Sequence, residues 1–254
     1  MSEANLRIAR RVIDEPYGWT ASYRATIDPA RLALELRVQL QPGLSVTAAD
    51  LAQVRQETVS AVARYYDQRF AVQEEGSGQQ RPVHVNVAFV TSDPDLKVTV
   101  HTGSGRDNLQ HWFLDSGVTA RAHELGHAFG LKDEYVDPLV RDRADACSAG
   151  VYRDHSLMGD FHQEGVARAE LKARHAAAII RDLNVTLGRA FKAAVVADDA
   201  GLQAGNPPSA EPGRVPAARA GGPVVFSIQA LREQARASAG HDFPEQDHSR
   251  RLRT

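Results

Sequence analysis

The sequence predicts an α+β fold, because strand-like and helix-like patterns alternate along it. Apolar residues recur at every second position in two early segments, which is typical of half-buried strands. Other segments have apolar residues three and four positions apart, as in amphipathic helices. The 254 residues are 43% hydrophobic, enough to bury the core of one domain of about 200 residues with extensions.

The alternating segments predict four strands. The first two, 19–27 and 32–40, are separated by a short turn that contains Asp28 and Pro29, and this arrangement predicts a β-hairpin. Two further strands are expected at 83–89 and around 98–100. The apolar residues of the hairpin are Trp19, Ala21, Tyr23, Ala25 and Ile27 in the first strand and Leu32, Leu34, Leu36, Val38 and Leu40 in the second.

Two helices are expected in the first half of the chain. One begins after Thr47 and Asp50, which form a capping-box pattern, and continues to near Phe70. The other begins around 115–116, where the apolar spacing becomes helical again. Its side facing the core would carry Val118, Ala122, Leu125 and Phe129.

A long loop and a third helix complete the first 200 residues. Residues 132–162 show little periodicity, and a loop of this length usually has a function. A helix rich in Ala and Arg is expected from Val166 to about Leu183, with Asn184 as its C-terminal cap and a broken continuation toward Val196. Its candidate core contacts are Leu171, Ala178 and Ile179.

The domain boundaries follow from composition. Residues 1–200 are expected to form the folded domain, and 201–223 have the Pro, Gly and Ala content of a linker. Residues 224–254 would hold a short docking element followed by a disordered polar tail. A partner could bind through this last segment.

Charge and cysteine content exclude several classes of protein. The net charge of −2 gives no basic excess for nucleic acid, and no apolar run has the ~18 residues that a membrane span needs. The N-terminus lacks an apolar signal segment, and Cys147 is the single cysteine, which fits a reducing compartment. We therefore expect a protein that is cytoplasmic as synthesised, with non-classical export or delivery as an alternative.

The string His-Glu-Leu-Gly-His at residues 123–127 predicts a metal site. Positions i and i+4 share one face of a helix, so His123 and His127 can each place a ring nitrogen on one zinc ion. Glu124 lies about 100° around the helix, where it can act as the general base for an attacking water. The alternative is two ordinary surface histidines.

A third ligand is expected just beyond this helix. Gly130 follows His127 by three residues, where the chain must reverse and a positive φ favours glycine. Asp133 then supplies a carboxylate, which leaves a fourth position open for water, as a catalytic zinc requires. Glu134 and His155 are the alternatives for this third ligand.

The string HELGHAFGLKD at 123–133 resembles the metzincin zinc peptidases, whose signature is HExxHxxGxxH followed by a methionine turn. Asp133 stands in place of the third histidine, as in the snapalysin-type branch, and Met158 stands at the position of the methionine turn. The run that ends in Gly-Leu-Lys-Asp-Glu-Tyr also resembles bacterial immunoglobulin A-cleaving zinc peptidases. The resemblance covers roughly residues 30–185.

The resemblance implies a zincin-like fold and a reaction. The fold would be a twisted mixed β-sheet with a long backing helix, an active-site helix and a C-terminal helix. Met158 would form an apolar floor under the metal, although an ordinary buried methionine is the alternative. The strand at 97–102 would be the sheet edge along which an extended protein or peptide substrate binds.

One departure from the metzincin pattern concerns the transition state. Many metzincins have a tyrosine just after the methionine turn that helps to stabilise it, whereas Gly159, Asp160 and Phe161 follow Met158 here. The candidates to replace that tyrosine are Tyr135, Tyr152 and His155.

The function implied is that of a zinc-dependent endopeptidase with one catalytic Zn²⁺ and Glu124 as general base. One alternative is a narrow-specificity processing protease or delivered toxin. Another is a non-catalytic binding or structural component of a larger assembly that keeps zinc for stability. A thiolate of Cys147 that occupies the metal and holds the enzyme latent is a further alternative to an ordinary small buried side chain.

Overall fold

The computed structural model describes residues 4–27, 31–74 and 80–195, and it confirms the α+β class. The strands are β1 Ala4–Asp14, β2 Tyr17–Ile27, β3 Leu32–Pro42, β4 Phe70–Glu74, β5 Gln80–Phe89, β6 Leu96–His101, β7 His111–Phe113 and β8 Phe191–Val195. The helices are α1 Ala48–Tyr65, α2 Gly117–Ala128, α3 Phe161–Glu164 and α4 Ala173–Leu187. Short 3₁₀ turns occur at 114–116, 141–143 and 166–168.

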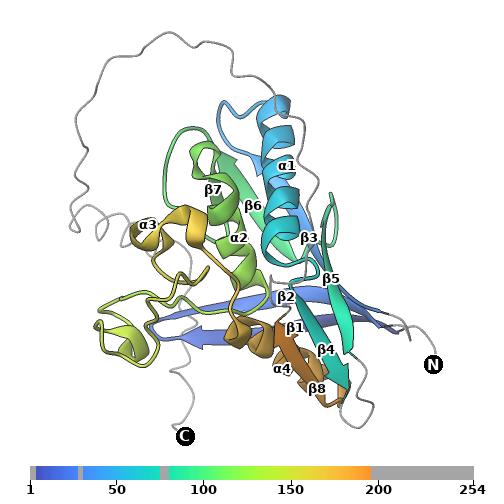
Figure 1. Ribbon diagram of the computed structural model, residues 1–254. Coiled ribbons are helices and arrows are strands. Elements are labelled where there is room, and N and C mark those ends of the chain that lie inside the picture. The colour runs from blue at the N-terminus through green and yellow to red at the C-terminus, as the bar shows by residue number, and fades with distance from the viewer. Residues whose placement is uncertain (1–3, 28–30, 75–79, 196–254) are drawn as a thin grey trace, which may run out of the picture. The chain divides into compact units, whose positions relative to one another are not determined.

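The strands of the described residues form one curled mixed sheet (Figure 1). Its order is β1-β2-β3-β5-β4-β8, with β6 pairing with both β3 and β7. The predicted hairpin is confirmed, since 24–27 of β2 pair antiparallel with 32–35 of β3. Beyond that point β3 pairs in parallel with β6 over 38–42, while β5 lies parallel along its other edge.

The helices α1 and α2 pack against each other (Figure 1). Thr47 and Asp50 form the predicted capping box at the start of α1. At the other end of α1, the Tyr66 hydroxyl donates to the Ala122 carbonyl oxygen at 2.7 Å, and Tyr65 bonds Thr119. These bonds fix α2 against α1.

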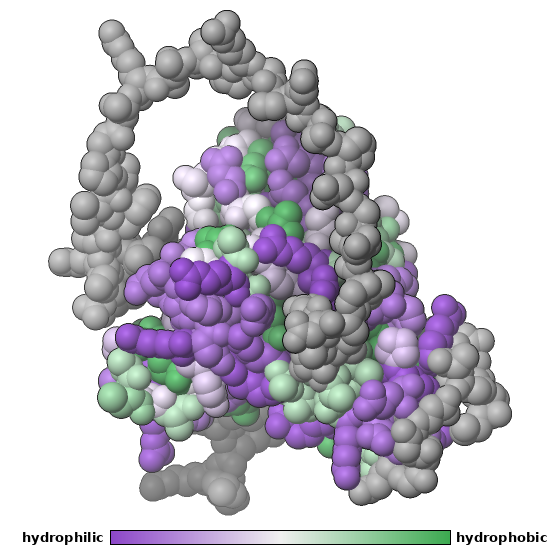
Figure 2. Space-filling view, in the orientation of Figure 1, coloured by the Kyte–Doolittle hydropathy of each residue, from purple (hydrophilic) through white to green (hydrophobic). Residues whose placement is uncertain are grey.

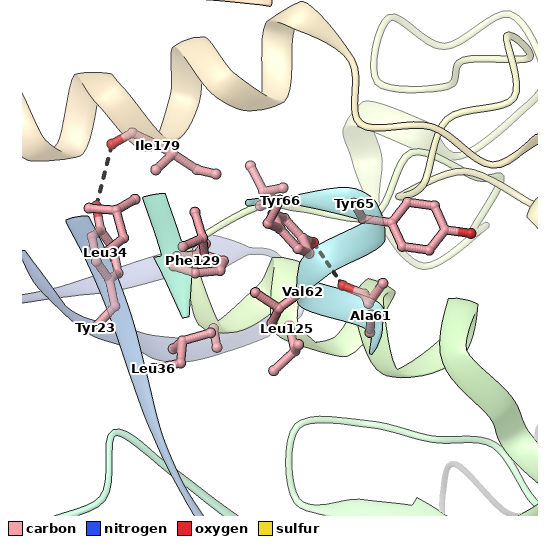
Figure 3. Close-up of a cluster of buried hydrophobic side chains, with 14 of the residues drawn as sticks. Tyr23, Leu34, Leu36, Ala61, Val62, Tyr65, Tyr66, Leu125, Phe129 and Ile179 are labelled. Carbon is pink, nitrogen blue, oxygen red and sulfur yellow. Dashed lines mark hydrogen bonds between the residues drawn. The ribbon is translucent and has the colours of Figure 1, made fainter. Parts of the chain in front are cut away.

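The core continues from these helices to α4. The Phe129 ring, just after α2, lies 5.3 Å from the rings of both Tyr23 and Tyr66 (Figure 3). Tyr23 in turn donates to the carbonyl oxygen of Ile179 on α4. The core side of α2 is as expected, because Ala122, Leu125 and Phe129 are buried and Val118 is packed against the cluster.

The prediction for the end of the first helix was wrong. α1 ends at Tyr65, and Phe70 begins strand β4. The helix cannot continue because Gln68 has a φ of 57°, in the left-handed region, so the chain turns out of the helical direction.

The predictions for the third helix were partly wrong. Residues 169–171 are not helical, Glu170 bridges to Ser156, and α4 begins only at Ala173. The helix ends at Leu187, and its C-terminal cap is Gly188, with a φ of 60°, and not Asn184. The Asn184 side chain instead bonds the backbone of Phe191, where β8 replaces the expected helical continuation toward Val196.

Strand β1 was not predicted, and the predicted free sheet edge was wrong. β1 pairs with β2 along its whole length, from Ala4 with Ile27 to Asp14 with Tyr17. β6 is covered by β7 over Thr99–His101, so the expected strand at 97–102 has neighbours on both sides there. The outer strand on that side is β7.

The chain separates into two units, Met1–Leu202 and Gln203–Thr254. The linker expected at 201–223 and the docking element and tail expected at 224–254 lie outside the described residues. Among the described residues, no helix has the length and apolar content to cross a membrane. Figure 2 shows a face on which hydrophilic residues predominate and hydrophobic ones are scattered.

Candidate metal centre

Helix α2 presents His123 and His127 side by side, with their rings 4.8 Å apart. The Nδ1 atom of each ring lies 2.9 Å from a backbone carbonyl oxygen, that of Leu157 for His123 and that of Leu131 for His127. A carbonyl oxygen only accepts hydrogen bonds, so Nδ1 of each ring carries the proton. In the neutral ring that binds a metal, each Nε2 is thereby left with a lone pair directed into the same space.

Asp133 reaches the two histidines because the chain reverses directly after α2. Gly130 has the predicted positive φ, 90°, and the Leu131 amide donates back to the Gly126 carbonyl. This turn brings Asp133 Oδ1 to 3.1 Å from His123 Nε2 and 3.2 Å from His127 Nε2. Metal bonds of about 2.1 Å at a tetrahedral angle would place ligand atoms about 3.4 Å apart. Asp133 Oδ1 therefore lies from each of the two nitrogens at about the spacing of two ligands on one cation.

Two carboxylate oxygens at this point are buried without a hydrogen-bond partner. They are Oδ1 of Asp133 and Oε2 of Glu124. Burial of polar atoms without partners is costly, and a bound cation with its water would satisfy both. The described residues contain one group of three or more side chains that could hold a metal ion, and it consists of His123, Glu124 and His127. The donor set thus fits a metal.

The electrostatics of the cluster reflect its burial. Burial raises the pKa of Glu124, although His127 and His123 oppose this effect. Burial also lowers the pKa of His127, but the Asp133 carboxylate more than offsets it, so the pKa is raised to about 9. Side-chain exposures of 9% for His123, 12% for His127 and 16% for Asp133 show that the cluster is not fully closed to solvent.

Met158 lies directly behind the helix that carries the histidines. It is fully buried, and a Cβ added at Gly126 would come within 2.6 Å of its sulfur. Gly126 stands between His123 and His127 in the motif, so the absence of a side chain there lets Met158 approach the helix. The carbonyl of Met158 accepts from the Glu134 amide at 2.7 Å, which ties this turn to the segment that carries Asp133.

The two alternative third ligands point elsewhere. Glu134 accepts two bonds of 2.7 Å from the Arg174 guanidinium and further bonds from Ser156 and His175. Burial raises the pKa of Glu134, but these partners outweigh it and lower the pKa to about 2. His155 contacts Glu164 and Arg168. Of the three candidates, the structure brings Asp133 to the histidines.

Of the three candidates for transition-state stabilisation, only Tyr135 lies beside the cluster. Its hydroxyl donates to Asp133 Oδ2 at 2.9 Å, and burial raises its pKa. Tyr152 lies under Arg174, whose Cζ is 3.8 Å from the ring centroid. His155 contacts Glu164 and Arg168, as described above. Cys147 is an exposed free thiol, which contradicts the buried position expected for it.

The sequence analysis missed three residues that support the cluster. Trp19, near the end of the β1–β2 hairpin, donates from Nε1 to the His127 carbonyl oxygen at 2.8 Å. Arg143 is buried and contacts Oδ2 of both Asp133, at 3.4 Å, and Asp14, at 3.1 Å. Because Oδ2 of Asp133 is held by Tyr135 and Arg143, Oδ1 is the oxygen left for a metal. No local pattern indicated these contacts between distant segments.

Comparison with known proteins gives no assignment. No protein-family model matches the chain, and no curated protein or solved structure was found to be similar to it. Any interpretation of the site therefore depends on the residues described above. Their geometry supports a metal-binding group with an adjacent buried carboxylate.

Proposed function

We propose that this protein is a zinc-dependent endopeptidase that hydrolyses peptide bonds in a protein or peptide substrate. The observation that carries the proposal is the convergence of His123 Nε2, His127 Nε2 and Asp133 Oδ1. Beside them lies the buried, unpartnered carboxylate of Glu124. Three ligands with a buried carboxylate beside them are the arrangement of a catalytic zinc site.

The choice of zinc rests on the chemistry of the donors. Two imidazoles and one carboxylate suit Zn²⁺ better than Mg²⁺ or Ca²⁺, which prefer oxygen ligands alone. The proposed ligands also have their supports in place, since both Nδ1 atoms bond carbonyl oxygens and Asp133 Oδ2 bonds Tyr135. Such supports fix the orientation of ligands before the metal binds.

In the proposed reaction, zinc when bound supplies a Lewis acid and lowers the pKa of a coordinated water to about 7. Glu124 takes a proton from the attacking water and later gives it to the leaving amine. The burial that raises the pKa of Glu124 makes this carboxylate a stronger base than an exposed one. His123, His127 and Asp133 hold their positions throughout.

The site supports catalysis better than a purely structural metal site. Structural zinc sites are closed by four protein ligands, whereas three converge here and their side chains keep some exposure to solvent. A structural site also has no use for Glu124, a buried carboxylate without a partner. The order of strand, long helix, further strands, motif helix, methionine turn and last helix supports a metzincin-like peptidase.

The first experiment combines metal analysis with a cleavage assay. Purified wild type is expected to contain one zinc per chain and to cleave unfolded casein in a chelator-sensitive manner. His127→Ala should lose both zinc and cleavage, because one ligand is removed. Glu124→Gln should keep zinc and lose cleavage by at least about 100-fold, since it cannot accept a proton. Glu170→Gln, at a side chain that is 62% exposed, is the matched control and should behave as wild type.

The possible results separate the alternatives. Zinc without any cleavage of casein would favour a structural site or a protease of narrow specificity, and a peptide library would then distinguish these two. Zinc-free wild type would disprove the metal centre. A fully active Glu124→Gln variant would remove Glu124 from its assigned role.

A further inference from the structure

The donor expected to stabilise the transition state is not supplied by the three candidates from the sequence. Tyr135 already donates its hydroxyl hydrogen to Asp133 Oδ2, and Tyr152 and His155 lie in other contacts. The position after the methionine turn is filled by Phe161, whose ring lies 5.5 Å from that of His123. A phenylalanine has no hydrogen-bond donor to offer.

Arg106 is a strong donor beside the site. Its Nη2 donates to the Tyr135 hydroxyl, and its Cζ lies 5.5 Å from the centroid of that ring. Because the same hydroxyl is 2.9 Å from Asp133 Oδ2, the guanidinium is two hydrogen bonds away from the proposed metal ligand. A guanidinium has five N–H donors, and Tyr135 is its only hydrogen-bond partner within the described part of the chain.

The loop that carries Arg106 is fixed on both sides of this residue. Before it, Gly105 packs under the Phe113 ring, where an added Cβ would lie 2.4 Å from the ring. After it, Asp107 is buried, accepts from the Phe113 amide at 2.8 Å and pairs with the buried Arg121 on α2. Arg106 itself is exposed. The backbone is thus held while the charged group reaches the Tyr135 hydroxyl.

The charge of Arg106 is coupled to the site. The Tyr135 oxygen and the carboxylates of Asp133 and Glu124 raise the pKa of Arg106. The guanidinium therefore lies within the electrostatic field of the cluster. A fixed positive charge close to developing negative charge stabilises a transition state without reorganisation of water.

We propose that Arg106 donates hydrogen bonds to the carbonyl oxygen of the scissile peptide bond as that oxygen becomes negative. This inference rests on the proposed peptidase function. As the water oxygen bonds to the carbonyl carbon, the C=O π electrons move to the carbonyl oxygen and a proton passes to Glu124. When the C=O bond re-forms, the C–N bond breaks and the amine takes that proton. Arg106 acts while the charge is on the oxygen, and Tyr135 positions it.

The test compares zinc-loaded full-length wild type with Arg106→Ala and Arg106→Lys. Arg153→Ala, which removes an exposed arginine without a described side-chain contact, is the matched control. With a peptide cut from casein as substrate, Arg106→Ala should lower kcat by about 100-fold and leave KM within about threefold. Arg106→Lys should restore part of kcat. Zinc content should remain that of wild type in all variants.

A second readout does not depend on turnover. A phosphinic analogue of the cleaved peptide carries a tetrahedral, negatively charged centre, and calorimetry on the zinc-loaded proteins measures its binding. Arg106→Ala should weaken this binding by about 100-fold, as expected for an interaction made in the transition state. In a Glu124→Gln background, which binds but does not cleave, the same change should alter the affinity for the uncleaved peptide by less than about threefold.

The outcomes separate this inference from the proposed function. If wild type cleaves and Arg106→Ala is equally active, only the assignment of Arg106 fails. A raised KM with unchanged kcat, or weaker binding of the uncleaved peptide, would make Arg106 a substrate-binding residue and overturn the inference. Loss of zinc in Arg106→Ala would show that Arg106 supports the ligand Asp133 and would overturn the inference. If zinc-loaded wild type cleaves neither casein nor any member of the peptide library and does not bind the phosphinic peptide, the peptidase proposal itself fails, and the inference with it.

Discussion

The candidate metal centre at Asp133 and the ion-pair cluster at Glu134 begin at neighbouring residues but differ in how their oxygens are used. Oδ1 of Asp133 faces two imidazole nitrogens and has no hydrogen-bond partner. Both oxygens of Glu134 are bonded, to Arg174, His175 and Ser156. We refer to these last three residues and Glu134 as the Glu134 cluster.

The difference shows how one segment can serve both stability and chemistry. The Glu134 cluster joins α4 to the turn that contains Ser156 and Met158, and its charges are compensated within the protein. The centre at Asp133 keeps one uncompensated position, which is what a ligand site needs. Because the two residues are adjacent, the cluster also fixes the backbone from which Asp133 extends. Removal of the charge of Asp133 should therefore affect a different property from removal of the charge of Glu134.

The largest difference is expected in zinc affinity. Asp133→Asn removes an anionic ligand and should weaken zinc binding by more than about 100-fold, which exceeds the loss expected from an outer support. Glu134→Gln should change zinc affinity by less than about tenfold, because Glu134 does not face the histidines. Competition with a chromophoric chelator measures both values. Retention of zinc by Asp133→Asn together with its loss from Glu134→Gln would reverse the two assignments.

For the stability of the metal-free protein, we expect the larger effect from a substitution of Glu134. Glu134→Ala leaves the charge of Arg174 and the buried His175 without their main partner and should cost about 3 kcal/mol, the lower end for a broken buried pair because Arg174 is 29% exposed. Glu170→Ala, at an exposed side chain, is the control and should cost less than about 0.5 kcal/mol. Urea unfolding measures both. Equal stability of the two variants would show that the cluster is not a structural support.

Acid should weaken the same cluster. The pKa of Glu134 falls from its ordinary 4.5 to about 2 in the folded protein, so its contribution is complete above pH 4.5 and is lost as the pH falls toward 2. Between pH 4.5 and about pH 3, metal-free wild type should lose about 2 kcal/mol that Glu134→Gln does not lose. Parallel stability curves for the two proteins across this range would contradict the assignment.

The sequence was sufficient to predict those features of the structure that depend on residues close together in the chain. His123, His127, Gly130 and Asp133 lie within eleven residues, so helical spacing and one positive-φ turn determine their arrangement. The capping box at Thr47 was predictable for the same reason. The spacing after Gly130 favoured Asp133 but left its neighbour Glu134 as an alternative, because the difference depends on partners from α4 and from the turn that contains Ser156.

Contacts between distant segments account for most of what was missed. Trp19 and His127 are separated by 108 positions, and Asp14 and Arg143 by 129, so no periodicity could relate them. The Ala-rich run before Ala173 favours a helix by propensity, but pairing of Glu170 with Ser156 overrides it. Contacts of this kind occur around the site, and there they outweigh local propensity.

The smallest expected effect on zinc affinity tests whether Tyr135 orients the carboxylate of Asp133. Tyr135→Phe removes the hydroxyl that donates to Asp133 Oδ2 at 2.9 Å and leaves Arg143, at 3.4 Å, as the other partner. Zinc affinity should fall about tenfold, or about 1.4 kcal/mol, because a less restrained carboxylate binds less well. Tyr152→Phe removes a hydroxyl from a ring that packs under Arg174 and should leave zinc affinity unchanged. Equal affinities in the two variants would mean that Arg143 alone orients Asp133, and that the metal centre depends on the β1–β2 hairpin through Asp14 more than on its own loop.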